Sequence, residues 1–201
     1  MHVTDPSTTL VKQKRGAGLL PFAVHDNRVL FLFQTTFSGR KAGHLIDFGG
    51  GVAAGETEQE AAVREFIEET ETMYFCDDLS RAARSVERIE QQLPVVHALL
   101  EQTLVAHPDW WCRRAPGNPS RQRRWKTFFV EIPYRDVDPL NQEWEGDTTG
   151  RFRKRRLLFW VPGDDLIAIY KSDPGRLWKR VRQLEGAPDT VRAILRSKSS
   201  G

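Results

Sequence analysis

Residues 50–72, GGVAAGETEQEAAVREFIEETET, decide the fold that this sequence predicts. A glycine-rich segment leads into a run from Glu58 to Thr70 that contains neither glycine nor proline, so about three turns of helix fit there. Thr57 stands just before this run, and Glu60 follows three residues later, which is the pattern of a capping box. The stretch therefore predicts a glycine loop followed by a capped helix.

The predicted helix has two chemically different faces. At about 100° per residue, Glu65, Glu68 and Glu69 fall on one side with Arg64 beside them. Like charges at this spacing destabilise an isolated helix by roughly a few tenths of a kcal/mol per pair, whereas Mg²⁺ or Mn²⁺ takes clustered carboxylates as ligands. The acids therefore predict a metal site, with a solvated acidic face as the plain alternative. The opposite face should pack inward: Val63, Phe66, Ile67 and Thr70.

These residues resemble the Nudix box of the Nudix hydrolases, written G-x5-E-x7-R-E-U-x-E-E-x-G-U, in which U is a bulky apolar residue. The matching positions are Gly50, Glu56, Arg64, Glu65, Phe66, Glu68 and Glu69. Glu71 stands where the motif has glycine, and Thr72 where it has an apolar residue. A left-handed conformation costs Glu71 about 1 kcal/mol, so the helix should end differently or run on. Outside residues 50–72 the resemblance is weak.

The resemblance implies an α/β sandwich with a mixed sheet between helices and the box at one edge of the sheet. It also implies a Mg²⁺- or Mn²⁺-dependent hydrolase that cleaves nucleoside diphosphates linked to another moiety, usually by water attack on phosphorus. Nucleotide sugars, ADP-ribose, dinucleoside polyphosphates and nucleoside triphosphates all stay open as substrates. A catalytically silent nucleotide- or RNA-binding module is the alternative, since the end of the box is altered at Glu71 and Thr72.

The same resemblance gives roles to the box residues. The expected metal ligands are Glu65, Glu68, Glu69 and a backbone carbonyl of Gly50 or Gly51. Arg64 should hold a carboxylate through a bidentate pair, and Glu56 should bind metal through water or stabilise the loop. The general base stays open between the box acids and four acids elsewhere in the chain: Glu131, Glu143, Glu145 and Asp147.

Composition limits the class of protein. With 201 residues, of which 39% are hydrophobic and 28% charged, the chain suits one soluble domain with a sizeable core. No apolar run approaches the roughly 20 residues of a membrane span, and the N-terminus lacks a signal-peptide pattern. Cys76 and Cys112 give no disulfide framework, which favours reduced thiols. We therefore expect a cytoplasmic protein without a membrane partner.

Positive charge gathers in two segments, Arg113–Lys126 and Arg151–Arg156, although the net charge is only +3. Arginines between aromatic rings can hold phosphates and stack on bases, while the plain alternative is core tryptophans with solvated arginines. The candidate substrate-binding residues are Arg40, Arg123 and Trp125. We expect a nucleotide-type small molecule as partner; nucleic acid is not favoured, and a homodimer stays open.

The remaining elements are predicted from apolar runs and from glycine and proline positions. Strands are expected at Gly16–Val24, Arg28–Gln34, His44–Phe48, Met73–Cys76, Thr127–Pro133 and Arg155–Val161, with a tight turn at His25–Asn27. Helices are expected at Leu79–His107, as two helices or one kinked at Pro94, and at Leu166–Tyr170, Leu177–Leu184 and Thr190–Leu195. Loops are expected at Asp109–Trp125 and Asp136–Asp147.

We expect the whole chain, residues 1–201, to form a single Nudix hydrolase domain with three additions. Residues 1–15 should be a loose arm, and residues 197–201 a disordered tail. Residues 79–125 should be an insertion, helical over about 79–107, that shapes substrate access or a dimer interface.

Overall fold

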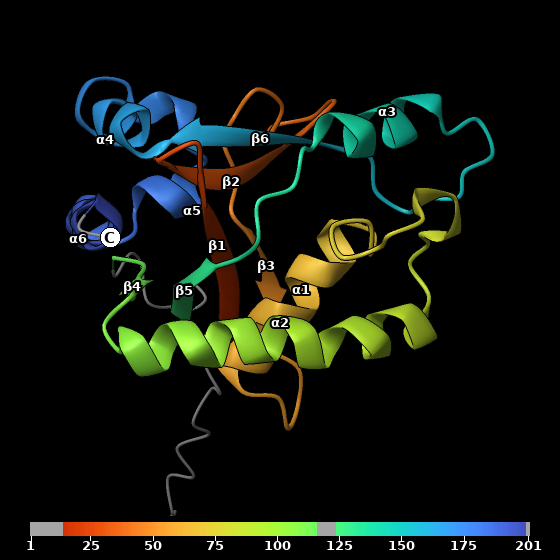
Figure 1. Ribbon diagram of the computed structural model, residues 1–201, viewed down its shortest axis with the longest axis horizontal. Coiled ribbons are helices and arrows are strands. Elements are labelled where there is room, and N and C mark those ends of the chain that lie inside the picture. Colours follow the sequence, from red (N-terminus) through yellow and green to blue (C-terminus); the bar gives the residue numbers. More distant parts are fainter. Residues whose placement is uncertain (1–13, 116–123, 200–201) are drawn as a thin grey trace, which may run out of the picture.

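The computed structural model describes residues 14–115 and 124–199, and within them six strands form one mixed sheet (Figure 1). The strands are β1 (Arg15–His25), β2 (Arg28–Thr36), β3 (Phe48–Gly51), β4 (Trp111–Arg113), β5 (Arg124–Glu131) and β6 (Arg156–Pro162). Their order is β4-β5-β1-β2-β6, and β3 pairs with β1 beside β2. β1 and β5 run parallel, and the other pairs are antiparallel.

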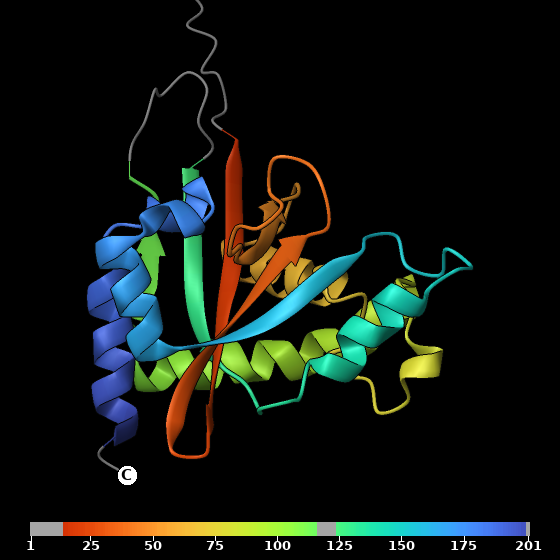
Figure 2. The ribbon, with the colours of Figure 1, turned by 90° about the horizontal axis from the view of Figure 1, so that it is seen from above.

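Helices cover both faces of this sheet (Figure 1, Figure 2). α1 (Glu58–Glu69) and α2 (Val86–Ala106) pack on one face, and α4 (Gly163–Ser172) and α6 (Ala187–Ser199) pack on the other. α3 (Asp138–Gly146) lies against β6. The short helices are η1 (Leu79–Arg81), η2 (Pro174–Arg176) and α5 (Lys179–Arg182). The predicted α/β sandwich with a mixed sheet is therefore confirmed.

The central strand β1 is buried on both sides because its alternate residues enter two separate cores. Leu19 joins the core under α1 and α2, whereas Leu20 joins the core under α4 and α6. The predicted turn into β2 is also confirmed, since Asp26 and Asn27 have φ of 47° and 58°, as a two-residue hairpin turn of type I′ requires. The hairpin thus forms the middle of the sheet.

Two predicted strands are wrong in position or kind. The strand expected at His44–Phe48 begins only at Phe48 and includes the glycines, with Gly50 paired to Ala17 of β1. The segment expected as a strand at Met73–Cys76 is a series of turns, in which Cys76 N–H bonds the Met73 carbonyl at 3.2 Å. Its apolar side chains are buried all the same, which is why a short apolar run alone does not identify a strand.

The helical predictions need three corrections. α2 runs without a break through Pro94, and it begins at Val86, so the residues before it do not belong to the same helix. The acidic loop expected at Asp136–Asp147 is largely α3, because Leu140 and Trp144 are one turn apart and both are fully buried. The loop expected at Asp109–Trp125 contains β4 and the start of β5.

The C-terminal and N-terminal boundaries also differ from the expectation. The helix expected at Leu177–Leu184 is reduced to the short α5, while α6 begins at Ala187 and continues to Ser199. Residues 197–199 of the expected disordered tail are therefore helical, and Arg15 of the expected arm opens β1. The segment expected as an insertion packs closely, because α2 lies against both α1 and β5.

We expect Phe66→Ala to lower the free energy of unfolding by about 3–5 kcal/mol, because it opens a cavity in the core under α1. Phe66 is fully buried and meets Phe48 edge-on, with ring centroids 4.9 Å apart. Urea unfolding at equilibrium measures the change. Val105→Ala is the control, since Val105 is 85% exposed and its loss should cost less than about 0.5 kcal/mol. Equal losses in the two variants would contradict this account of the core.

Candidate functional site

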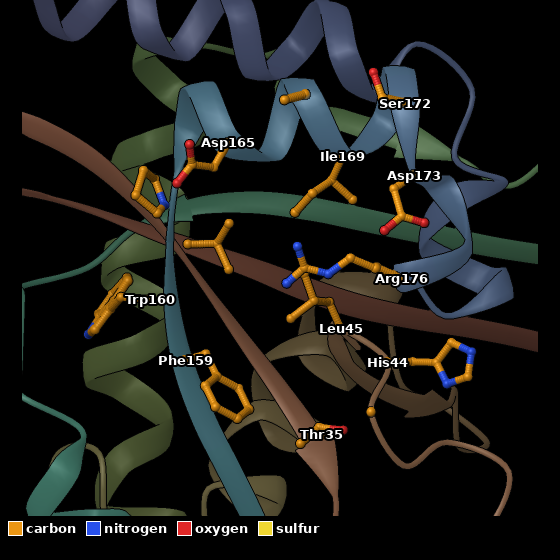
Figure 3. Close-up of a pocket in the computed structure, with 14 residues that line it drawn as sticks. Thr35, His44, Leu45, Phe159, Trp160, Asp165, Ile169, Ser172, Asp173 and Arg176 are labelled. Atoms are coloured by element: carbon orange, nitrogen blue, oxygen red, sulfur yellow. The ribbon is translucent and has the colours of Figure 1, made fainter.

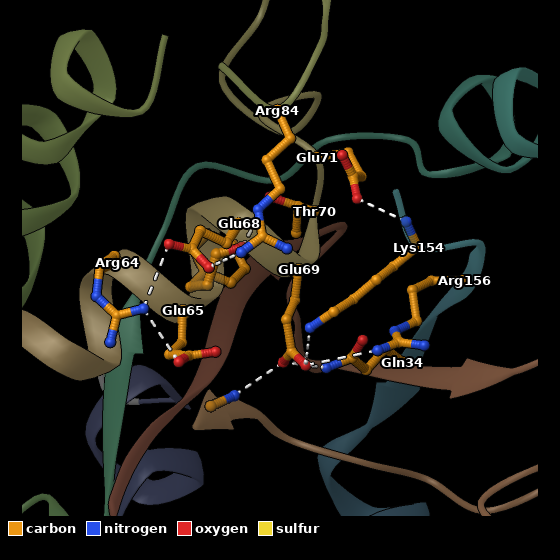
Figure 4. A network of polar contacts seen from close by, with 12 residues as sticks. Gln34, Arg64, Glu65, Glu68, Glu69, Thr70, Glu71, Arg84, Lys154 and Arg156 are labelled. Atoms are coloured by element: carbon orange, nitrogen blue, oxygen red, sulfur yellow. Dashed lines mark hydrogen bonds and ion pairs between the residues drawn. The ribbon is translucent and has the colours of Figure 1, made fainter. Parts of the chain in front are cut away.

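Arg64 on α1 connects the helix to the segment before it (Figure 4). Its Nε and Nη2 atoms donate to the two oxygens of Glu56 at 2.8 and 3.2 Å, so the predicted bidentate pair exists. Nη2 also donates to the Gly51 carbonyl at 3.0 Å, and Nη1 donates to Glu65 at 3.0 Å and to Glu68 at 3.3 Å. The guanidinium group therefore makes five contacts, which matches its five N–H donors.

Glu56 supports the segment before the helix. Besides the Arg64 pair, its Oε2 accepts the N–H of Ala53 at 2.8 Å. Burial raises its pKa, but the hydrogen bonds from Arg64 and Ala53 outweigh burial and hold the pKa of Glu56 below its ordinary value. The hydrogen bond to Glu56 in turn raises the pKa of Arg64. Of the two roles expected for Glu56, these contacts supply the loop-stabilising one.

Glu65 lies directly against the backbone of Gly50. A Cβ atom built on Gly50 would overlap the Glu65 carboxylate, so any other residue at position 50 would require this side-chain end to move. Burial raises the pKa of Glu65; Arg64 opposes this shift, and the neighbouring charges of Glu69 and Glu68 add to it. The site thus holds a partly buried carboxylate in contact with a backbone that carries no side chain.

Glu68 and Glu69 each have cationic partners already. Glu68 pairs with Arg64 and, on its other oxygen, with Arg84. Glu69 is buried: its Oε2 accepts hydrogen bonds from Gln34 Nε2 at 2.6 Å and from Gly49 N–H at 2.8 Å. Figure 4 shows these partners around the acidic face of α1. The three acids therefore lie side by side, as predicted, but each is bound within the protein.

The end of α1 explains the two departures from the box motif. Glu71 has φ of 51° and Thr72 of 62°, so the chain adopts the left-handed conformation that the motif assigns to glycine. Thr72 N–H bonds the Ile67 carbonyl at 3.0 Å and Glu71 N–H bonds the Glu68 carbonyl at 3.2 Å, which is a Schellman motif. The helix therefore ends as a glycine-capped helix would, with a buried glutamate in the glycine position.

Sequence reasoning missed a group of basic residues around Glu69. Lys154 Nζ and Arg156 Nη2 lie 3.9 and 3.6 Å from Glu69 Oε1. Lys41 interacts electrostatically with the same carboxylate; burial lowers the pKa of Lys41, Arg180 lowers it further, and Glu69 opposes the change. The signals were the basic run at 151–156 and the Arg-Lys pair at 40–41, but only the fold brings the two segments together.

A second missed pair anchors the start of β3. Asp47 is fully buried, and its Oδ1 accepts Arg180 Nε at 2.7 Å, while its Oδ2 accepts the Thr127 hydroxyl at 3.0 Å. Arg180 also donates to the Asp47 carbonyl at 3.0 Å and lies over the ring of Trp125, 4.0 Å from its centroid. Burial raises the pKa of Asp47, against the opposing effects of Arg180 and Thr127. Arg180 therefore holds the start of β3, whereas Arg64 of α1 holds its end at Gly51.

The predicted substrate-binding residues are not gathered at the site. Trp125 is buried, and its ring fills the space over the glycines of β1 and β3, where a Cβ on Gly16, Gly18 or Gly49 would come to 3.0 Å or closer. This places Trp125 in the core, so the stacking role expected for it is corrected to a structural one. Arg40 is exposed in the loop after β2, and Arg123 lies outside the described residues.

The acids proposed as general bases outside the box are engaged elsewhere. Glu131 pairs with Lys198 at 2.6 Å. It also lies far from the glycine strand: Gly50 pairs with Ala17, Ala17 pairs with Lys126, and Glu131 is five residues, or roughly 17 Å, further along β5. Glu143 pairs with Arg151, and Glu145 is exposed on α3. Asp147 accepts three backbone N–H groups, which hold its pKa at about 2. Glu145 is the exception, since its side chain is exposed, so Glu145 and the box acids stay candidates for the general base.

A separate hollow of about 640 Å³ lies on the other face of the sheet, between β6, α4 and the segment 43–45 (Figure 3). Ile169, Leu45 and Phe159 give it apolar walls, and Figure 3 shows the Arg176 side chain extending across it. Thr35 lines this hollow, whereas its neighbour Gln34 bonds Glu69, and adjacent strand residues point to opposite faces. The sheet therefore separates the hollow from the acids of α1.

The ligand types on the acidic face of α1 suit a divalent cation, but the carboxylates are not arranged as a metal site in this structure. Carboxylate oxygens are the ligands that Mg²⁺ and Mn²⁺ prefer, and the Gly50 backbone is open beside Glu65. Within residues 14–115 and 124–199, however, no three acidic, imidazole or thiol groups lie in a cluster that could hold a metal ion as they stand. The reason is visible in the contacts, since arginines occupy the carboxylates. The metal ligands expected from the sequence stay a prediction.

Comparison with known proteins gives likenesses in structure only. No family model matches the sequence, and no curated protein matches it. An Ap4A hydrolase of C. elegans in a binary complex is similar at 15% identity, with 93% of this chain and 100% of that chain covered and a TM-score of 0.48. A Nudix hydrolase from M. smegmatis is similar at 14% identity, with 92% of this chain and 86% of that chain covered and a TM-score of 0.39. A mutT/nudix family protein from Listeria innocua is similar at 12% identity, with 93% of this chain and 94% of that chain covered and a TM-score of 0.44.

These low identities and scores leave the residues of β3 and α1 as the basis for assigning a function. Over the described parts of the chain, no helix is both long and apolar enough to cross a membrane.

We expect Gly50→Ala to lower the free energy of unfolding by about 1 kcal/mol, the low end of overpacking costs, because the added methyl group displaces only the carboxylate end of the flexible Glu65 side chain. Thermal or urea unfolding measures the loss. Gly146→Ala is the matched control, since a Cβ at Gly146 meets nothing within 4 Å. If both variants unfold like the parent protein, Gly50 does not confine Glu65.

We expect Arg180→Leu to cost about 3–5 kcal/mol at pH 7, because it leaves the Asp47 carboxylate buried without its partner. A raised pKa in the folded state means that the folded chain binds the proton more tightly than the unfolded chain. The deficit is therefore largest above that raised pKa and shrinks as the pH falls toward the unfolded value of about 4. Urea unfolding between pH 4 and 8 tests the sign.

Two further variants complete this test. Arg182→Leu changes an exposed arginine of the same short helix and should be close to neutral. Adding Asp47→Asn to Arg180→Leu should recover much of the loss at pH 7, since it removes the buried charge. A deficit that stays constant across the pH range would show that Asp47 is not responsible.

Proposed function

We propose that this chain is a Nudix-type pyrophosphohydrolase, which uses Mg²⁺ or Mn²⁺ to hydrolyse the pyrophosphate bond of a nucleoside diphosphate linked to another moiety. One observation carries the proposal: Arg64 fixes two acids of α1, Glu65 and Glu68, beside a strand of glycines. This agrees with the box motif over residues 50–72, and it places the Glu65 carboxylate directly against the bare backbone of Gly50.

The acids of α1 are the groups that would hold the divalent ion, together with the Gly50 carbonyl. When bound, such an ion neutralises charge on the pyrophosphate oxygens and orients the reacting groups. Because Glu68 is paired with Arg84 and Glu69 with Arg156, binding requires that at least one of these ion pairs loosen. Arg64 can stay in place, since its bidentate pair is with Glu56 rather than with an expected ligand.

Glu65 is the acid best placed to take a proton. Glu69 Oε2 accepts two hydrogen bonds, and Glu68 is paired on both oxygens. Among the described residues, Glu65 accepts one hydrogen bond, from Arg64 to its Oε1. In the proposed reaction the water oxygen attacks phosphorus, its proton passes to Glu65 Oε2, and the bridging P–O bond breaks. Two phosphate-bearing products leave, and the proton is released to solvent.

The substrate is proposed as a class only: a nucleotide-type small molecule with at least two linked phosphates. An assay must decide which class it belongs to: nucleotide sugars, ADP-ribose, dinucleoside polyphosphates or nucleoside triphosphates. A cytoplasmic location is proposed as well, and the two free, buried cysteines support it because reduced thiols suit that compartment. A homodimer stays a prediction.

We expect Glu65→Gln, Glu68→Gln and Glu69→Gln each to reduce turnover by about a hundredfold or more, because each removes a charge from the reacting site. The assay is a panel of the four substrate classes with Mg²⁺ and with Mn²⁺, and mass spectrometry of the products identifies the bond cleaved. Reaction in ¹⁸O-water shows which phosphorus is attacked.

Glu101→Gln on the exposed side of α2 is the control and should keep parental turnover. Urea unfolding of every variant separates lost chemistry from lost fold. Full activity of both the Glu68 and the Glu69 variants on a confirmed substrate would disprove the site, and no product from any substrate class with either metal would disprove the function.

A further inference from the structure

Two basic side chains, those of Lys154 and Arg156, approach one oxygen of the Glu69 carboxylate, and a third, Lys41, is electrostatically coupled to the same carboxylate. Lys154 and Arg156 come from the end of the 147–156 segment, and Lys41 comes from the loop after β2. Lys154 Nζ is 3.9 Å and Arg156 Nη2 3.6 Å from Glu69 Oε1, and Lys41 interacts electrostatically with the same group. These distances exceed those of good hydrogen bonds, so Lys154 and Arg156 lie near Glu69 without being closely bound to it.

Around Glu69 Oε1, in the part of the chain that the structure describes, the positive charges are not fully neutralised, and one hydrogen-bond donor has no acceptor. The three cations face two carboxylates, those of Glu69 and Glu71, and the nearby Asp47 is already paired with Arg180, so the group keeps one positive charge in excess. Arg156 Nε is buried and has no hydrogen-bond partner among the described residues. A buried N–H without an acceptor is costly, and an anionic oxygen is the acceptor that a guanidinium group binds best.

We propose that Lys41, Lys154 and Arg156 form a binding subsite for the phosphate groups of the substrate, beside Glu69. The identity of the ligand as a polyphosphate rests on the function proposed above. Planar guanidinium groups bind two phosphate oxygens at once, and lysine ammonium groups act as point charges. Because Glu69 belongs to the acidic face of α1, phosphates held here lie next to the acids that would hold the metal ion.

Glu71 supports this subsite from behind. Its Oε1 accepts the N–H of Lys154 at 2.8 Å, and its side chain is buried under the same segment. The glutamate in the glycine position of the box therefore links the end of α1 to the segment that carries Lys154 and Arg156. Glu71 is a positioning residue, and this tether offsets the strain of its left-handed backbone.

Binding of inorganic tripolyphosphate to the metal-free protein, measured by calorimetry, tests the subsite directly. We expect Arg156→Gln to raise the Kd about tenfold, as the loss of one charge-assisted contact does, and Lys154→Gln and Lys41→Gln to raise it by a smaller factor. Lys171→Gln, an exposed lysine of α4 on the other face of the sheet, should leave the Kd unchanged. Lys154 is partly exposed, so its variant keeps the test valid if Arg156→Gln fails to fold.

Glu71→Gly tests the tether. Glycine suits the left-handed backbone, so the variant should fold, but without the carboxylate the 153–156 segment loses its anchor and tripolyphosphate should bind more weakly. The proposal is overturned if the parent protein does not bind tripolyphosphate, or if the Arg156 and Lys154 variants bind it as the parent does.

Kinetics separate this subsite from the proposed function. On a confirmed substrate, Lys154→Gln should raise KM while kcat stays close to the parental value. If no substrate is hydrolysed but tripolyphosphate binding still depends on Arg156 and Lys154, the subsite stands and the hydrolase proposal fails. If hydrolysis proceeds and these variants change neither KM nor Kd, the hydrolase proposal stands and the subsite fails.

Discussion

The guanidinium group of Arg64 is the contact on which the site depends. It pairs with Glu56, takes the Gly51 carbonyl and reaches Glu65 and Glu68, so a single side chain fixes the segment before α1, the end of β3 and two of the acids. Without it, neighbouring carboxylates would repel one another on a partly buried face, where low dielectric strengthens the repulsion. A lysine could not replace it, because an ammonium group has three donors and no planar fork.

The acids of α1 are balanced by cations from four places in the chain. Arg64 belongs to α1 itself, Arg84 precedes α2, Lys154 and Arg156 lie at the start of β6, and Lys41 follows β2. This balance keeps a crowded set of carboxylates stable in the absence of other ligands. If the acids hold a cation and the bases a polyphosphate, as proposed, each ligand favours the other, since the first takes over the acids and the second takes over the released bases.

Local chemistry made the box helix predictable. The capping box of Thr57 and Glu60, the acidic face and the bidentate pair of Arg64 depend on residues at most a few turns apart, and all three are present. The expectation that the helix would end differently or run on at Glu71 is wrong, because the Schellman motif places Glu71 in the left-handed conformation that the box motif gives to glycine. The α/β layers were expected from the resemblance to the Nudix box, which agrees with strands predicted before and after the box helix.

Contacts between distant segments could not be predicted in the same way. Trp144 sits in a stretch rich in acids, so its burial, which makes α3 a helix, shows only in the folded core. Trp125 looked like a stacking surface because arginines surround it in the sequence, yet the glycines of β1 and β3 leave a space that its ring fills. Glu69 has Gln34 and Arg156 as partners, and no rule of sequence spacing connects these two residues to α1.

The strand of glycines shows why those distant contacts matter. Phe48–Gly51 has one side chain larger than hydrogen, so packing of its own side chains cannot fix its position. Arg64 therefore holds its C-terminal end from α1, and Arg180 holds its N-terminal end from α5 through Asp47 and, at 3.4 Å, the Gly49 carbonyl. A strand that has almost no side chains of its own is thus positioned by two arginines, one from each layer of helices, so the glycines of β3 depend on both arginines for their place in the sheet.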